Sequence, residues 1–341
     1  MEKGIACCGH WVVDRTKTID RFPEENGIAQ VLSETIGSGG CAFNTIINLA
    51  KFDADLPLQA VGMLGEDPEG DYILQQCSSF PNIDSRHLVR SKQERTACTD
   101  VYSVPSKGTR TFFSLLGASR LLGPETIDLD SLDASIFHLG YLSLLEAFDG
   151  ADDEFGRVSA RFLKAVQEKG IKTSLDMIST EDPDFAEFIL PALPYTDFLI
   201  LNDYEAERLT GQSVRSDGSP DLWRLGEVSL RLLDHGIGEL VTIHFPEGAY
   251  LRTQRGDMVI QCAFAIPKEQ IKGTAGAGDS FCAGLLYGLH QGFTLTDCME
   301  FATCAGALSL HDVSTTGAIG NCDLVWQIRK RYPLRQDWFS C

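Results

Sequence analysis

The sequence predicts an α/β fold, with a mainly parallel central sheet between two layers of helices and a small second sheet beside it. Three observations predict this fold. Short apolar runs alternate with stretches of helical periodicity along most of the 341 residues. Two segments alternate polar and apolar residues at period two, as antiparallel strands do. Two glycine-rich segments each adjoin a predicted helix. In folds that alternate strand and helix, ligands bind beyond the carboxyl ends of the parallel strands.

The elements of the main layer follow from their apolar spacing. Short apolar runs indicate buried strands, and apolar residues at helical spacing indicate helices that cover them. The predicted strands are residues 5–8, 58–61, 135–139, 173–175, 198–201 and 240–243. The predicted helices are residues 43–52, 155–169, 204–210, 222–235 and 280–291.

The two period-two segments, residues 14–36 and 96–114, predict hairpin strands of a small sheet, with Lys107 and Gly108 in one turn. Such a sheet could close over the carboxyl ends of the main strands as a lid that excludes water. An ordinary edge hairpin would give the same pattern. We find no linker or repeat, so we expect residues 1–341 to form a single domain with the lid strands inserted in it.

Composition excludes several function classes. The net charge of -19 argues against a nucleic-acid or anionic-membrane partner, since either would need a basic surface. No apolar run is long enough to span a bilayer, and the N-terminal residues do not resemble a secretion signal, so a cytoplasmic location is expected. The eleven cysteines show no spacing typical of zinc sites and are expected to be buried reduced thiols.

The most informative segment is Gly-Thr-Ala-Gly-Ala-Gly-Asp-Ser-Phe at residues 273–281. Its glycines stand at the entrance of a predicted helix, where unpaired N–H groups and the helix dipole attract anions. Asp279 is well placed there to hold or deprotonate a hydroxyl nucleophile while the amides neutralise a phosphoryl group. The local pattern alone fits a simple helix cap equally well.

A second glycine run, residues 37–44, opens the helix that carries Asn44. Its letters approach the dinucleotide-binding fingerprint, with Asp55 near the distance expected of a ribose-binding acid. A dehydrogenase of that type would bind a nicotinamide cofactor. We rank this interpretation low because the fingerprint belongs directly after the first sheet strand, whereas a hairpin-like segment intervenes here.

Together the two glycine sites resemble those of the PfkB, or ribokinase-like, family of carbohydrate kinases. The N-terminal signature is matched by Gly39, Gly40 and Asn44, and its continuation by VGMLGEDPEG at residues 61–70. The C-terminal signature is matched from residue 274 to residue 281, and an Asn-x-x-Glu motif by Asn202 and Glu205. Four landmarks in the same order cover nearly the whole chain. The resemblance implies a ribokinase-like three-layer α/β/α sandwich with a β-sheet lid.

The resemblance also implies roles for individual residues. The catalytic group would be the base Asp279 with the anion-hole segment Gly276, Ala277 and Gly278, to which Ala275 also contributes. The substrate would be bound by Asp14, Gly39, Gly40, Asn44 and Arg110. The nucleotide would be bound by Asn202, Glu205, Thr242, Thr274, Ala275 and Cys304. Glu205 would also organise Mg²⁺ through water. Taken singly, Asn202 and Glu205 could be a helix cap, Asp14 a turn cap, and Lys51, Arg110, His138 and His244 solvated or structural residues.

Three positions depart from the family pattern. Gly273 stands where the signature usually has an Asp that helps shape a monovalent-cation site, which argues against potassium dependence. His244 stands where a Thr-x-Gly sequence usually places a glycine near the nucleotide. The Asp-x-Asn-x-Arg run of several sugar kinases is absent around Asp176.

The expected activity is Mg²⁺- and ATP-dependent phosphorylation of a primary hydroxyl on a small sugar or sugar-like compound. The first alternative is a nucleoside kinase of the same family, in which Phe43, Phe112 and Phe113 stack on a base. The second alternative is a non-catalytic sugar- or nucleotide-binding protein. An Asp has a reference pKa of about 3.9, and a helix N-terminus favours its charged form, so Asp279 is expected to be a weak base that accepts the proton late. Dimerisation through the lid strands is a further expectation.

Overall fold

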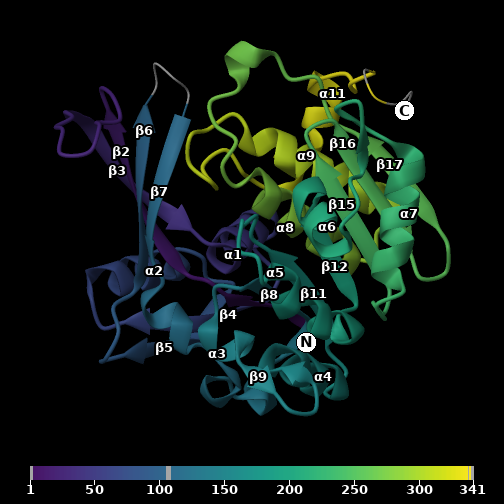
Figure 1. The fold of residues 1–341 in the computed structure, drawn as a ribbon, viewed down its shortest axis with the longest axis horizontal. Helices are drawn as coiled ribbons and strands as arrows, with labels where there is room; N and C mark the ends of the chain where they lie inside the picture. The colour runs from purple at the N-terminus through teal and green to yellow at the C-terminus, as the bar shows by residue number, and fades with distance from the viewer. Residues whose placement is uncertain (1–2, 105–108, 337, 339–341) are drawn as a thin grey trace.

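A large twisted sheet organises the molecule (Figure 1). The computed structural model describes residues 3–104, 109–336 and 338. Within these residues, nine strands form the main sheet in the order β17-β16-β15-β12-β11-β8-β1-β4-β5. The pairs from β15 to β5 are parallel, and the pairs β15–β16 and β16–β17 are antiparallel. The predicted mainly parallel sheet is confirmed.

All six predicted strands lie within strands of this sheet. Their apolar runs are fully buried, as expected of parallel strands covered on both faces. The sequence patterns did not identify β16 or the two edge strands β5 and β17, which are partly exposed. The strands are β1 (Gly4–Gly9), β4 (Leu58–Gly65), β5 (Ile83–Ser91), β8 (Ala134–Leu142), β11 (Lys172–Met177), β12 (Phe198–Asn202), β15 (Leu240–Phe245), β16 (Gly248–Thr253) and β17 (Met258–Cys262).

The five predicted helices are present, with shifted ends. The helix expected at residues 155–169 begins only at Val158, because the residues before it form the short hairpin β9 (Ala151–Asp152) and β10 (Gly156–Arg157). The helix expected from residue 280 begins at Ala277, so Asp279 lies inside its first turn rather than before it.

The helices of the described residues follow in chain order. They are α1 (Cys41–Phe52), α2 (Pro68–Ser78), α3 (Glu146–Asp149), α4 (Val158–Glu168), α5 (Phe185–Ile189), α6 (Asp203–Thr210), α7 (Leu222–Leu233), α8 (Ala277–His290), α9 (Leu295–Ser309), α10 (Cys322–Trp326) and α11 (Ile328–Arg331). Short 3₁₀ turns lie at Gly117–Leu121, Pro124–Thr126, Leu129–Ser131, Leu190–Tyr195 and Lys268–Gln270, and a small hairpin joins β13 (Arg215–Ser216) to β14 (Ser219–Pro220).

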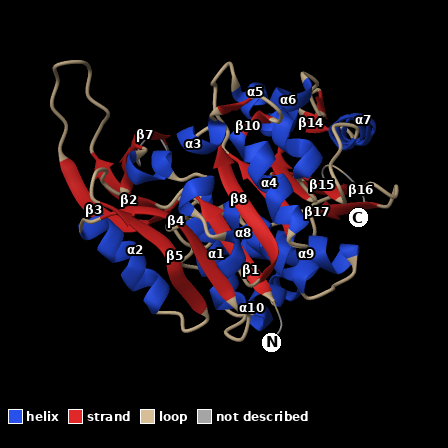
Figure 2. Ribbon diagram, turned by 90° about the horizontal axis from the view of Figure 1, so that it is seen from below, coloured by secondary structure: helices blue, strands red, loops and turns tan. Residues whose placement is uncertain are grey.

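Helices cover both faces of the main sheet (Figure 2), and a hydrophobic core lies on each face. Successive residues of a strand point to opposite faces, so Ile5 and Cys7 of β1 enter one core and Ala6 and Cys8 enter the other. The first core is covered by α1, α2 and α8–α11, and the second by α4–α7. This is the three-layer sandwich that the sequence predicted.

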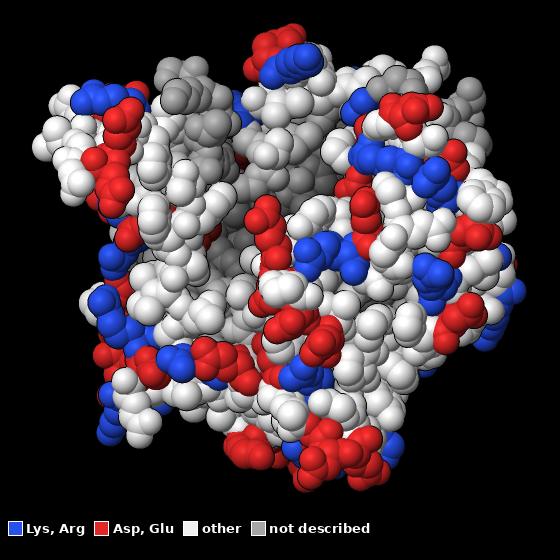
Figure 3. Space-filling model, viewed as in Figure 1, with Lys and Arg blue, Asp and Glu red and all other residues white. Residues whose placement is uncertain are grey.

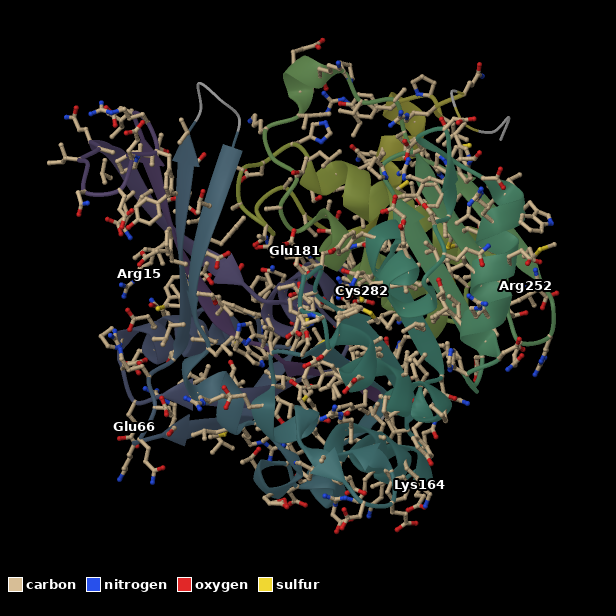
Figure 4. The ribbon with its side chains drawn as sticks, in the orientation of Figure 1. Arg15, Glu66, Lys164, Glu181, Arg252 and Cys282 are labelled. Carbon is tan, nitrogen blue, oxygen red and sulfur yellow. The ribbon has the colours of Figure 1, made fainter. Side chains whose placement is uncertain are left out.

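A second sheet of four strands, in the order β3-β2-β6-β7, stands away from the main one (Figure 1). Its strands are β2 (Val12–Ile19), β3 (Val31–Gly39), β6 (Ala97–Val104) and β7 (Thr109–Leu115). Arg15 of β2, labelled in Figure 4, forms an ion pair with Glu69 at the start of α2, which ties the small sheet to the main body. The expected turn at Lys107 and Gly108 lies outside the described residues.

The cysteines depart from expectation at one position, because Cys262 is disulfide-bonded. Nine other cysteines of the described residues are free thiols, most of them buried. In the part of the chain that the structure describes, no helix is both long and apolar enough to cross a membrane.

Candidate active site

Asp279 lies in the first turn of α8, where the first turn of α1 and the end of β8 meet it. Its carboxylate accepts a hydrogen bond from Asn44 Nδ2 at Oδ2 (2.7 Å) and one from the Tyr141 hydroxyl at Oδ1 (3.0 Å). The side chain is only 8% exposed. Asn44 and Asp279 come from the two glycine-rich segments, 235 residues apart in sequence. The structure therefore joins the two segments in one site.

The pKa of Asp279 does not follow the sequence-based expectation. Burial raises the pKa of this carboxyl above its ordinary value, although the hydrogen bonds from Asn44 and Tyr141 act in the opposite direction. The expected lowering of this pKa is therefore wrong in direction, because the cost of placing a charge out of water exceeds the stabilisation from the two hydrogen bonds. A carboxylate with a raised pKa is a stronger proton acceptor.

The loop at residues 312–317 packs against both glycine segments. The Thr315 hydroxyl donates to Asn44 Oδ1 (2.9 Å), so Asn44 is held at both ends of its amide. Gly276 has a φ of 78°, and a Cβ there would lie 2.6 Å from the Thr315 carbonyl oxygen. Only glycine fits this turn, which places the N–H groups at the start of α8.

Lys51 is not the solvated residue that was expected. Its ammonium donates to the Thr316 carbonyl oxygen (2.7 Å), which brings a positive charge to the same loop. Burial lowers its pKa, while the nearby Asp312 acts to raise it.

The other predicted substrate residues lie on the small sheet and at its junction with α1. Asp14 lies on β2, and a Cβ on Gly39 would come within 2.4 Å of its Oδ1. Gly40 precedes α1 with a φ of 81°, and a Cβ there would meet the His10 carbonyl oxygen at 2.2 Å. The absence of a side chain at Gly39 leaves room for the Asp14 carboxylate, and its absence at Gly40 leaves room for the His10 carbonyl group. Arg110 lies on β7, but its side chain is outside the described part of the structure.

Asn202 and Glu205 form a reciprocal cap at the start of α6. Asn202 Oδ1 accepts from the Glu205 N–H (2.9 Å), and Glu205 Oε2 accepts from the Asn202 N–H (2.8 Å). Glu205 Oε1 also accepts from the Ser179 hydroxyl (2.8 Å). Burial raises the pKa of Glu205 to about 7, against the effect of these hydrogen bonds. Asn202 and Glu205 therefore do form the helix cap, and the buried Glu205 carboxyl in this cap changes its protonation state near neutral pH.

A cavity of about 830 Å³ opens beside the start of α8. Thr274, Ala277 and Gly278 line one end of it, together with Asn202. The remainder is mostly apolar; its lining includes Tyr204, Phe245, Phe264, Ile266, Phe281, Ala307 and Leu310. The space-filling view shows a face hollowed between the small sheet and the main body (Figure 3).

His244 and Thr303 add polar groups to this cavity. The His244 ring packs on Phe281, with ring centroids 5.1 Å apart, and its Cε1 lies 3.5 Å from where a Cβ on Gly278 would be. Burial lowers the pKa of His244 to about 4, so the ring is neutral. Thr303 Oγ1 is buried and has no hydrogen-bond partner among the described residues.

Four of the six predicted nucleotide residues do not line the cavity, namely Glu205, Thr242, Ala275 and Cys304. Thr242 is fully buried in the middle of β15, while His244, two residues later, reaches the cavity. Cys304 is buried in α9, and its neighbours Thr303 and Gly306 line the cavity in its place. Ala275 lies between Thr274 and Gly276 and is partly exposed.

Sequence reasoning missed Tyr141 as a site residue. It placed Thr315 only within residues 314–317, which the family resemblance assigns to adenine-side and monovalent-cation contacts, and not beside Asn44. Neither lies in a motif with a recognisable spacing. Tyr141 follows a predicted strand by two residues, and that position at the carboxyl end of a parallel strand was the available signal. Thr315 is in a loop whose contacts to Asn44 depend on the tertiary fold.

Comparison with known proteins gives a consistent result. The model of the pfkB family of carbohydrate kinases matches residues 2–320. The chain is 26% identical over 304 residues to a ribokinase of Arabidopsis thaliana, covering 88% of this chain and 73% of that protein. It is 26% identical over 308 residues to an ATP-dependent ribose-1-phosphate kinase of Halopiger xanaduensis, covering 89% of this chain and 91% of that protein. It is 23% identical over 301 residues to a nucleoside kinase of Methanocaldococcus jannaschii, covering 87% of each.

Solved structures agree on the fold. The Arabidopsis thaliana ribokinase complexed with ribose and ATP superposes with a TM-score of 0.80 at 22% identity, covering 96% of this chain and 99% of that chain. The Thermotoga maritima ribokinase gives a TM-score of 0.79 at 18% identity, with the same coverage. The predicted ribokinase-like fold is confirmed.

Proposed function

Because the chain belongs to the pfkB family of carbohydrate kinases, and is thus a phosphotransferase with an alcohol acceptor, we propose that it transfers the γ-phosphoryl group of ATP to a primary hydroxyl of a small sugar. The observation that carries this proposal is the position of Asp279. A buried carboxylate, held by Asn44 and Tyr141, stands at the N-terminus of α8 beside a large cavity.

Asp279 acts as the base. It orients the acceptor hydroxyl and takes its proton as the oxygen attacks phosphorus. Its raised pKa supports proton acceptance, and the two hydrogen bonds fix the direction of its oxygen atoms. The N–H groups around Gly276, Ala277 and Gly278 stabilise charge on the transferred group. In the free protein the Ala277 N–H lies 3.4 Å from the Thr274 carbonyl oxygen, a weak bond that a phosphoryl oxygen can replace.

Mg²⁺ supplies positive charge to the phosphates when it is bound. Glu205 fits an indirect role because its oxygens already accept three hydrogen bonds, from Asn202 and Ser179. Mg²⁺ keeps several of its waters and binds few protein groups directly. Asn202, which lines the cavity, and Glu205, bonded to it, would thus hold the ion through water.

The cavity is the donor site in this proposal. Its apolar walls suit a purine or pyrimidine ring, and its end at Thr274 and Gly278 adjoins the helix N-terminus that would bind phosphates. The orphaned Thr303 hydroxyl supplies a hydrogen-bonding group to that site. His244 narrows it next to Gly278.

A sugar acceptor is favoured over a nucleoside by one observation. Phe43, expected to stack on a base, is fully buried, and its ring packs on Trp11 at 5.3 Å. Phe112 and Phe113 of β7 are exposed and remain candidates for base stacking. The nucleoside kinase is therefore the second candidate function.

We also propose that the activity needs no monovalent cation. Gly273 brings no carboxylate to this loop, and a Cβ there would already lie 3.0 Å from the Asp312 carbonyl oxygen. The Lys51 ammonium reaches the Thr316 carbonyl oxygen in the same loop and supplies a fixed positive charge.

The small sheet is proposed to act as a lid within a single domain, and as a dimer contact. Neighbouring residues of a strand point to opposite faces. The adjacent Phe112 and Phe113 are both more than half exposed, so both faces of the sheet present aromatic surface. One face of the small sheet covers the acceptor beside Asp14, and a second copy of the chain covers the other face.

The dimer contact is tested by sedimentation equilibrium, which should give twice the chain mass of 37.4 kDa. A monomer at all concentrations contradicts this contact.

The test is ADP formation by the purified protein with MgATP and a panel of ribose, fructose, ribose 1-phosphate, adenosine and other nucleosides. We expect turnover with one or more sugars, abolished in Asp279→Asn. Turnover with nucleosides alone supports the second candidate function. Absence of ADP across a broad panel favours a non-catalytic binding protein and contradicts the proposal.

A further inference from the structure

Four buried side chains of types that can bind a metal lie close together on elements around the Asn44–Asp279 pair. Cys41 is the first residue of α1, Cys282 lies in α8, His138 in β8 and Asp176 near the end of β11. Donor atoms of Cys41, His138 and Asp176 all lie within 4.8 Å of one another. Cys282 Sγ lies 3.8 Å from His138 Nε2. Figure 4 labels Cys282 near the centre of the molecule.

The imidazole is already oriented as a metal-bound imidazole would be. His138 Nδ1 lies 3.1 Å from the Ser174 hydroxyl, which leaves Nε2 facing the Cys282 thiol. Metal-ligating histidines usually have their second nitrogen fixed by such a partner. Gly140 leaves room for the cluster, because a Cβ there would lie 2.5 Å from Cys41 Sγ.

The donor set and its spacing suit a thiophilic divalent cation. Zn²⁺ binds cysteine sulfur at about 2.3 Å and histidine nitrogen at about 2.0–2.1 Å in a tetrahedron, which separates the two donors by about 3.6 Å. The observed separation of Cys282 and His138 is close to that value. Soft sulfur ligands select against Mg²⁺, which prefers oxygen. A lone buried thiol would be ordinary packing, but two thiols, an imidazole and a carboxyl converge here.

We infer that Cys41, His138 and Asp176 form a binding site for Zn²⁺ or a similar thiophilic ion, with Cys282, beside His138, as its fourth ligand. Cys41 precedes Asn44 by three residues on α1, and Cys282 follows Asp279 by three residues on α8. The ion therefore links the two helices whose side chains make the Asn44–Asp279 hydrogen bond, and it places positive charge beside the carboxylate. It acts as an inhibitor by stabilising the deprotonated carboxylate and so weakening the base. The inhibition rests on the proposed function, whereas the binding site does not.

Binding is tested directly with Co²⁺ as a probe on the reduced, chelator-treated full-length protein without nucleotide. Cobalt bound by thiolate shows an intense near-ultraviolet sulfur-to-metal band. We expect that band at one equivalent, displaced by Zn²⁺. Cys41→Ser and Cys282→Ser should each weaken binding by about tenfold or more, the effect of disturbing a metal site. Cys298→Ser, a buried thiol in α9, is the matched control and should bind as the parent protein does.

Two results overturn the site: no thiolate band at any Co²⁺ concentration, or a band that persists in both Cys41→Ser and Cys282→Ser. If either variant fails to fold by circular dichroism, Ser174→Ala provides the test. This change leaves every ligand in place and should weaken Co²⁺ binding by about tenfold; unchanged affinity contradicts the site. The band does not depend on kinase activity, so failure of the proposed function leaves this result readable. Inhibition of sugar phosphorylation by Zn²⁺, reversed by a chelator, is the separate functional measurement.

Discussion

Asn44 donates a 2.7 Å hydrogen bond from its side-chain amide to the Asp279 carboxylate, and it is 2% exposed. A donor to the charged form of an acid lowers its pKa. In the opposite direction, burial raises the pKa of Asp279. The balance between these two effects decides the pH above which Asp279 is deprotonated and can accept a proton.

Replacing Asn44 by Ala should therefore reduce turnover and shift its pH profile. Loss of a hydrogen bond to a charged group costs about 1.5–3 kcal/mol, so kcat should fall by about 10- to 100-fold. The acidic limb of kcat should move to higher pH because the carboxylate has lost a donor. Asn48→Ala is the matched control, since its amide bonds the Ser280 hydroxyl (3.1 Å) one turn further along α1. An equal shift of the acidic limb of kcat in Asn44→Ala and Asn48→Ala would show that the Asn44 hydrogen bond has no specific effect on Asp279.

Replacing Asp279 by Asn should remove the proton acceptor while keeping the shape of the side chain. We expect kcat to fall by about 10² or more, the low end of general-base contributions. The KM values for both substrates should change little, because binding uses other groups. Steady-state kinetics with the best acceptor of the panel measures both constants. A kcat near that of the parent protein would refute the assignment of the base.

Replacing Gly276 by Ala should disturb the start of α8. A left-handed conformation alone costs a non-glycine residue about 1–2 kcal/mol. At Gly276 the new Cβ would also meet the Thr315 carbonyl oxygen, which should reduce activity as well as stability. Gly292→Ala is the control, because Gly292 has a φ of 69° with open space around it. Denaturant unfolding and kcat together should separate the two variants; equal activity loss in both contradicts the role of the Gly276 turn.

The pH dependence of MgATP use should report Glu205. Its pKa of about 7 means that it is protonated in the free enzyme at low pH and charged at high pH. Because the charged form is the one that would organise Mg²⁺ through water, kcat/KM for MgATP should rise as pH increases through 7. Glu205→Gln should lower kcat/KM and remove this limb. Glu207→Gln, an exposed acid on the same helix, should leave the limb in place.

The Lys51 ammonium should make the enzyme independent of potassium. The rate in KCl should equal that in a large organic-cation chloride at the same ionic strength. Lys51→Met should lower kcat by about tenfold or more, the cost of a charged hydrogen bond, and potassium should restore part of the loss. Lys164→Met is the control, since Lys164 pairs with Glu168 on the surface of α4 (Figure 4). Potassium stimulation of the parent protein would contradict this role.

Much of the fold could be predicted because its signals are local. The buried runs at residues 5–8 and 198–201 are strands since a strand covered on both faces must be apolar throughout. The edge strands β5 and β17 escaped prediction because partial exposure dilutes that pattern. Helix ends shifted where glycine turns decided them, as at Gly276 and Gly156.

The candidate site also contains residues that local sequence patterns predicted and contacts that only the tertiary structure showed. The sequence by itself determined the two glycine segments, Asp279 and Asn44, because helix entrances rich in glycine are local features. Only the tertiary structure decided that Asn44 and Tyr141 both bond Asp279, and that Thr315 bonds Asn44. It also decided that burial raises the pKa of Asp279, and that Cys41 and Cys282 converge on His138. These relationships depend on which side chains meet across strands and helices far apart in the chain, and on how much water is excluded there.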